Sequence, residues 1–157
     1  MPDKHPLIAI RNGLLEAKTS SVAIPPSEAL PNVWGCMMET GYPQGAATVF
    51  YVADGSASLY FPGSGGVIGA GGQPPVRAAG QALLKISEHV LASLDPTQDF
   101  SFPQLGHVRF YVLTHSGPRS AQGHAEALGN GTGPLSVLFF AVHALISQIR
   151  LAAPPAK

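Results

Sequence analysis

The most constraining feature of this sequence is an Asp-Gly pair set between two apolar runs. Asp54-Gly55 follows the run 48–53 and precedes the run 56–61. An Asp-Gly pair in this setting is a strong short-range signal for a β-hairpin with a two-residue turn. We therefore expect an antiparallel hairpin over residues 48–61.

A two-residue turn also predicts which side chains share a face of the sheet, because directly opposed residues lie on the same face. The predicted core face is Phe50, Val52, Ala57 and Leu59, and the opposite face carries Val49, Tyr51 and Tyr60 among serines. The composition of the second face suits a partly wet surface or a subunit contact.

Hydrophobic periodicity and turn residues place the remaining elements. The patterns predict helices over 6–18, 75–94 and 134–150, and strands near 33–40 and 107–114. The stretch 19–31 is expected to be an extended connector, and 152–157 a disordered tail. Residues 1–151 then form one α+β domain, a sandwich of a mainly antiparallel sheet packed by about three helices.

The order of these elements resembles that of profilin-like and roadblock-like domains, small sheet-and-helix folds that often serve as dimeric scaffolds. The resemblance is topological and implies no site residues. The low charge content also favours a dimeric scaffold, since nine basic and nine acidic residues make up only 11% of the chain. A monomer would expose an unusually apolar surface, so we expect a homodimeric scaffold or regulatory module acting through protein association.

The charge pattern also excludes several partners. The nine cations are scattered from Lys4 to Lys157 without a run, so neither nucleic acid nor an anionic membrane is an expected partner. Cys36 is the only cysteine, which predicts a reduced cytoplasmic setting. We expect a buried thiol on the face shared with Trp34. The apolar window 135–151 is interpreted as a core helix, with His143 as a hydrogen-bonded core histidine.

A first glycine-rich loop, 62–75, contains six glycines and runs into a predicted helix. Backbone N–H groups and the helix dipole could hold an anion there. The candidate ligands are Gly69, Gly71 and Gly72, with Arg77 as the cation. The loop matches neither the phosphate-loop form nor the dinucleotide fingerprint, so a purely structural loop is the alternative.

A second loop, 115–133, gathers His115, Arg119, His124 and Glu126. The spacing fits no zinc motif, so no metal site and no cofactor is predicted. Histidine is the side chain most often used for proton transfer, so His115 and His124 are candidates for general acid–base catalysis, whereas a solvated surface loop is the alternative.

The two loops together define a second functional hypothesis. In it the protein is a small enzyme or an anionic-ligand sensor, with its site between loops 62–75 and 115–133. Arg77 and Arg119 would bind an anionic group, and His115 or His124 would transfer a proton.

Overall fold

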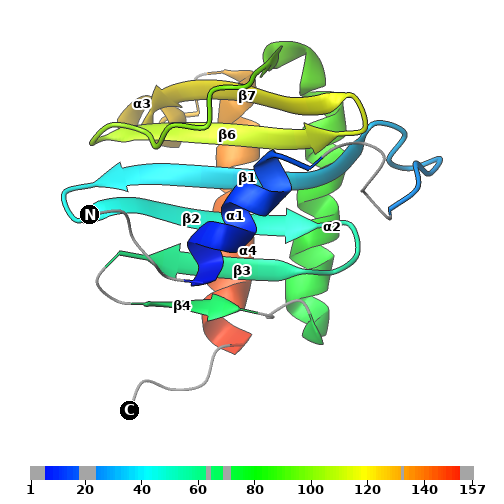
Figure 1. Cartoon of the computed structure of the whole chain (residues 1–157), viewed down its shortest axis with the longest axis horizontal. Helices are drawn as coiled ribbons and strands as arrows, with labels where there is room; N and C mark the ends of the chain where they lie inside the picture. The colour runs from blue at the N-terminus through cyan, green and yellow to red at the C-terminus, as the bar shows by residue number, and fades with distance from the viewer. Residues whose placement is uncertain (1–5, 18–23, 63–64, 69–71, 132, 153–157) are drawn as a thin grey trace.

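The computed structural model describes residues 6–17, 24–62, 65–68, 72–131 and 133–152 of the 157-residue chain. Seven antiparallel strands form one sheet in the order β4-β3-β2-β1-β6-β7-β5 (Figure 1). The strands are β1 Val33–Tyr42, β2 Gly45–Val52, β3 Ala57–Phe61, β4 Gly65–Ile68, β5 Asp95–Pro96, β6 His107–Thr114 and β7 Gly117–His124. The predicted α+β fold class is confirmed.

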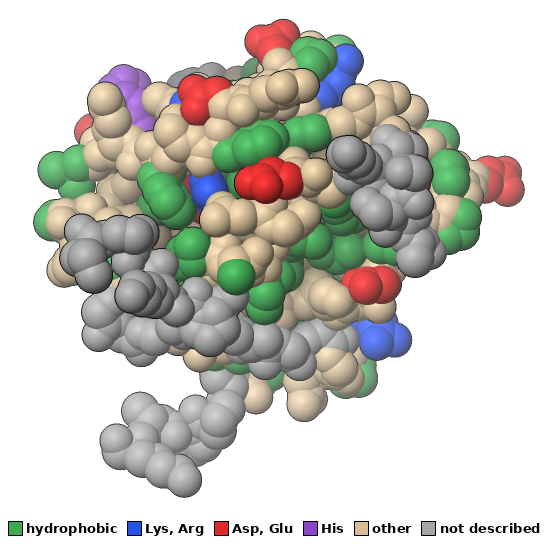
Figure 2. Space-filling model, in the orientation of Figure 1, with side chains coloured by type: hydrophobic (Ala, Val, Ile, Leu, Met, Phe, Trp, Pro, Cys, Tyr) green, Lys and Arg blue, Asp and Glu red, His purple; other side chains and the backbone are tan. Residues whose placement is uncertain are grey.

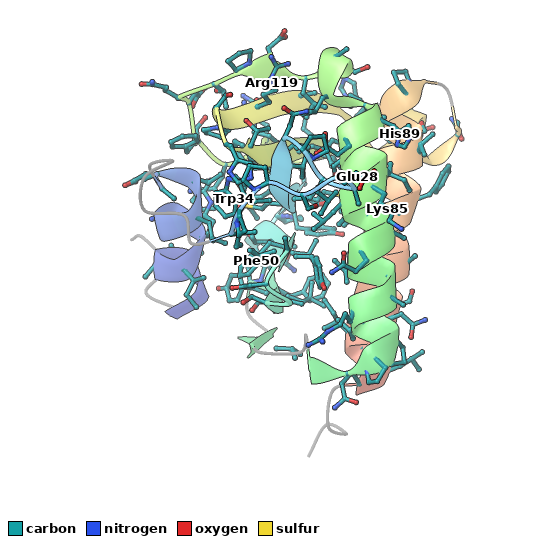
Figure 3. The ribbon with its side chains drawn as sticks, turned by 90° about the vertical axis from the view of Figure 1, so that its right-hand side faces the viewer. Glu28, Trp34, Phe50, Lys85, His89 and Arg119 are labelled. Carbon is teal, nitrogen blue, oxygen red and sulfur yellow. The ribbon has the colours of Figure 1, made fainter. Side chains whose placement is uncertain are left out.

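Helices cover both faces of the sheet, as the edge-on view shows (Figure 3). The helices are α1 Pro6–Leu15, α2 Pro74–His89, α3 Ala125–Gly129 and α4 Pro134–Ala152, and a 3₁₀ turn, η3, spans Leu91–Ser93. Helices α2 and α4 pack side by side on one face, and α1 lies on the other. α2 ends earlier than predicted because the chain tightens into η3 after His89.

The sheet therefore has a hydrophobic core on each side. The larger core lies between the sheet and the helices α2 and α4, and the smaller one lies between the sheet and α1. Trp34 belongs to the smaller core and Cys36 to the larger one, so the prediction that they share a face is wrong. The physical reason is a register irregularity between Val33 and Gly35, which offsets the alternation of side chains.

A buried ion pair fixes α1 to the sheet. The Arg11 guanidinium donates to both carboxylate oxygens of Glu39 in β1, over 2.9 and 2.8 Å. Glu39 also accepts a hydrogen bond from the hydroxyl of Thr48 over 2.7 Å. Arg11 and Glu39 are 3% and 0% exposed, so the position of α1 depends on a fully desolvated pair.

The hairpin forms at the predicted place with a different register. The Gly55 N–H donates to the Val52 carbonyl, and the Val52 N–H donates to the Ser56 carbonyl, both over 2.8 Å. The loop thus has three residues, and Gly55 takes a positive φ of 97° at its last position. Tyr51 pairs with Ala57, one residue away from the register that a two-residue turn would give.

A shift of one residue moves every side chain to the opposite face, so the predicted faces of the hairpin are wrong. Val49, Tyr51, Ala57 and Leu59 face α2 and α4, whereas Phe50, Val52 and Tyr60 face α1. All seven side chains are buried. The predicted subunit contact through Val49, Tyr51 and Tyr60 is therefore wrong, because these side chains are interior.

Most of the predicted loop 115–133 is regular structure. Residues 117–124 form β7, each paired with a residue of β6, and α3 follows directly. β7 was missed because it is rich in polar residues and glycine and lies half-exposed near the sheet edge, where the period-two apolar signal is weak.

In the predicted connector, the described residues 24–32 have no helix or strand. Of the predicted tail, Ala152 ends α4 and the rest lies outside the described residues.

Candidate functional site

The two glycine-rich segments lie toward opposite edges of the sheet. The first contains β4 and the second contains β7, and four strands separate them in the sheet order. With strands about 4.8 Å apart, this separation is roughly 24 Å. The structure therefore does not form a site between loops 62–75 and 115–133.

The two candidate arginines are also far apart and have different surroundings. Arg119 donates to the carbonyl oxygens of Leu91 and Leu94 over 3.1 and 2.9 Å, close to the C-terminal end of α2 (Figure 3). Arg77 is exposed in the first turn of α2, beside Gly55. Gly72 is exposed, and Gly69 and Gly71 lie outside the described residues.

His115 and His124 lie at opposite ends of β7. The backbone N–H of His115 donates to the carbonyl of Asn32 over 2.9 Å just after β6, whereas His124 is the last residue of β7. The strand between them spans eight residues, so more than about 20 Å separates the two rings. The structure does not bring them together, and an acid–base role for either one stays a prediction.

His124 instead faces His107 across the β6–β7 pair. Their ring centroids are 4.3 Å apart, with the ring planes at 43°. Glu126 is exposed in the first turn of α3. Within the described ranges, no group of three or more His, Cys, Asp or Glu side chains could hold a metal ion. The two imidazoles alone give an incomplete ligand set.

Cys36 is fully buried in the larger core, as predicted. Burial raises the pKa of its thiol to about 12, although hydrogen bonds from Ser87 and Met37 act in the opposite direction. A neutral thiol is a poor nucleophile. Cys36 therefore contributes packing rather than chemistry.

A cavity of about 280 Å³ lies between α4 and the strands β1, β2 and β3. Apolar side chains that include Met38, Val49, Leu59, Phe61 and Ile146 line it, together with Thr40, Tyr42, His143, Ser147 and Arg150. None of the described residues that line this cavity is acidic. Sequence reasoning did not find it, because its wall combines three strands with one helix.

Helical spacing places the α4 contribution on one side of the helix. His143, Ile146, Ser147 and Arg150 fall at intervals of three, four and seven residues, beside the core positions Leu138, Val142, Leu145 and Ile149. His143 follows Val142, which turns it about 100° away from the core. It is exposed, so its prediction as a core histidine is wrong.

Arg150 provides the only full positive charge among the lining residues at neutral pH. Its guanidinium carbon lies 4.8 Å from the centroid of the Phe61 ring. Partial burial lowers the pKa of His143, and the positive charge of Arg150 lowers it further. Both effects favour the neutral form of the His143 imidazole. The seven-residue spacing of His143 and Arg150 was the signal in the sequence that could have indicated their shared side of the helix.

The solvent side of α4 is also unusual. We call the set Val137, Phe140, Ala144 and Leu151 the α4 outer face. Three of its side chains, Val137, Phe140 and Leu151, are 51%, 50% and 79% exposed. By length and composition α4 could even cross a membrane, yet only 28% of its most apolar 18-residue window is buried in this fold. α4 therefore carries more apolar side chains than its packing against the core requires.

Comparisons with known proteins give no relatives for this chain. No family model matches it, and neither a curated protein nor a solved structure does.

Proposed function

We propose that the protein is a cytoplasmic scaffold or regulatory module that acts through association, as a homodimer in which the α4 outer faces of two copies pack together. The observation that carries the proposal is the exposure of Val137, Phe140 and Leu151 on a helix whose opposite side already completes the core. Large apolar side chains grouped on one helix face are typical of protein contacts.

Phe140 is the best anchor for such a contact. Its ring packs edge-to-face on Phe139, with centroids 5.9 Å apart, so the side chain is positioned before any partner arrives. Rigid aromatic side chains at the centre of an interface commonly carry much of the binding energy. The proposal therefore makes Phe140 the residue most sensitive to substitution.

Charge favours a second copy of this chain as the partner. The α4 outer face carries no ionisable side chain, and the formal net charge of the whole chain is zero at pH 7. Two copies therefore meet without long-range repulsion. On the face that α1 covers, the described acidic and basic side chains are scattered among apolar and neutral ones (Figure 2).

Sedimentation equilibrium at micromolar concentration tests the proposal. The wild-type protein should have twice the 16.3 kDa chain mass, and Phe140→Glu should shift it to the monomer without lowering its unfolding midpoint. Ala82→Glu is the matched control, because Ala82 is exposed on the neighbouring helix α2.

Three results would contradict the proposal. A wild-type mass near 16.3 kDa would show that the chain is monomeric, and a dimer that persists in Phe140→Glu would place the contact elsewhere. Flotation of the wild type with phosphatidylcholine vesicles, lost in Phe140→Glu, would assign the face to a membrane surface instead.

A further inference from the structure

The cavity beside α4 combines an apolar interior with an unbalanced positive charge. It is lined by β1, β2, β3 and the side of α4 that carries His143 and Arg150, and none of its lining residues belongs to the α4 outer face. We propose that this cavity binds a small amphipathic carboxylate, with Arg150 taking the carboxylate group and the apolar wall taking an aromatic or branched body.

The absence of a counter-ion favours an anionic group. In the described part of the chain, Arg11 and Arg109 form ion pairs with carboxylates, and Arg150 has no such partner there. Its guanidinium carbon lies over the Phe61 ring. A cation–π contact does not use the guanidinium N–H groups as donors to an acceptor atom, so they remain available to a carboxylate.

His143 supports the same assignment. Partial burial and then the positive charge of Arg150 lower its pKa, and both side chains line the same cavity. Tyr42 is the other titratable side chain that lines the cavity, and the remaining lining residues do not ionise. Among the described lining residues an incoming carboxylate would therefore meet Arg150 without a competing acidic side chain.

The shape and chemistry of the wall limit the body of the ligand. A volume of about 280 Å³ is just below the range typical of drug-sized ligands. The inner wall of Met38, Val49, Leu59 and Ile146 is apolar, whereas Thr40, Ser147 and Arg150 supply the polar groups. A compact apolar body with one terminal carboxylate fits this division, and a sugar or a nucleotide does not.

An NMR titration of the full chain with three probes that share a phenyl group on a three-carbon chain tests the assignment. The probes are 3-phenylpropanoate, the neutral 3-phenylpropan-1-ol and the cationic 3-phenylpropylamine. We expect the carboxylate to bind at least about tenfold more tightly than the alcohol, and the amine to bind least, because a charge-assisted hydrogen bond is lost and then replaced by repulsion.

Two variants and one control locate the binding site. Arg150→Gln should weaken carboxylate binding about tenfold or more while leaving binding of the alcohol unchanged. Ser147→Phe, a substitution on the exposed side of α4, should block both probes by filling the cavity mouth. Arg77→Gln is the matched control, an exposed arginine on α2, and should bind like the wild type.

Each remaining outcome would overturn the proposal. Equal binding of the three probes would remove the role of charge, and failure of the carboxylate to bind would remove the ligand class. Loss of binding in Arg77→Gln but not in Arg150→Gln would move the site to the N-terminal end of α2. The comparison of the three probes and the Arg150→Gln variant involve no residue of the α4 outer face, so failure here leaves the association proposal standing.

Discussion

Gly80 of α2 lies directly against the buried ring of Tyr51 in β2. A Cβ atom at position 80 would overlap three atoms of that ring, and the Tyr51 hydroxyl accepts a hydrogen bond from Gln81 of the same helix over 3.3 Å. The close approach of α2 to the sheet therefore depends on the missing side chain at Gly80. Since α2 also packs on α4, the same contact fixes the helix pair that carries both proposed sites.

Gly80→Ala should destabilise the domain even though alanine is the better helix former. The added methyl group must displace a fully buried tyrosine, and overpacking of this kind costs about 1 to 3 kcal/mol. Gly13→Ala in α1 is the matched control, because nothing lies within 4 Å of a Cβ at Gly13. It should stabilise by up to about 1 kcal/mol. Urea unfolding of both variants measures whether each one raises or lowers the free energy of unfolding. Stabilisation by Gly80→Ala would contradict the packing described.

Removing one partner of the Arg11–Glu39 pair should destabilise the fold more than replacing both partners together. Removal of one partner from a buried ion pair leaves an uncompensated charge and typically costs about 3 to 5 kcal/mol. We expect Arg11→Met and Glu39→Gln each to lower the free energy of unfolding by an amount of this order. The double variant should lose clearly less free energy of unfolding than the sum of the two single-variant losses. Additive losses in a double-mutant cycle would show that the two side chains do not act together.

Gly55→Val should lower the free energy of unfolding by about 1 kcal/mol or more. Gly55 has a φ of 97°, a conformation that a β-branched residue adopts only with strain. Gly129→Val is a comparison site, because Gly129 is an exposed helix-end glycine outside the positive-φ set. An unchanged denaturation midpoint for Gly55→Val would contradict the observed loop.

Stability should fall at high pH in a way that depends on Cys36. The folded thiol has a pKa of about 12, against 9.0 for an unperturbed cysteine. The unfolded chain therefore loses the proton first as the pH rises above 9, and linkage then favours unfolding. We expect the wild type to lose about 1 kcal/mol more than Cys36→Ala between pH 9 and 10. Parallel pH profiles of the two proteins would contradict the buried, protonated thiol.

The sequence predicted the hairpin but not its register, and the reason lies in the turn. Asp54-Gly55 suits a two-residue turn, and the same pair also fits a three-residue loop with Gly55 as its last member. The apolar pattern did not distinguish them because both faces of the hairpin are buried. The alternation of apolar and polar residues distinguishes two strand registers only when one face of the hairpin is polar.

The candidate site was harder to predict than the fold. The cavity needs Phe61 from β3, Thr40 from β1 and Arg150 from α4, and no local pattern records that these elements meet. Glycine content directed attention to segments 62–75 and 115–133 instead. The second of these is mostly strand and helix, and its glycines include Gly117, at the tight turn after β6, where φ is 111°.

Disulfide trapping at Ala144 tests the central claim most directly. Ala144 lies midway between Val137 and Leu151 on the α4 outer face, so a two-fold axis through that face passes closest to it. Cys36 is buried and can be left in place. Under mild oxidation, Ala144→Cys should form a covalent dimer of twice the 16.3 kDa chain mass, and Ala82→Cys on the exposed side of α2 should not. Rapid cross-linking of Ala82→Cys with none at Ala144→Cys would contradict association through α4.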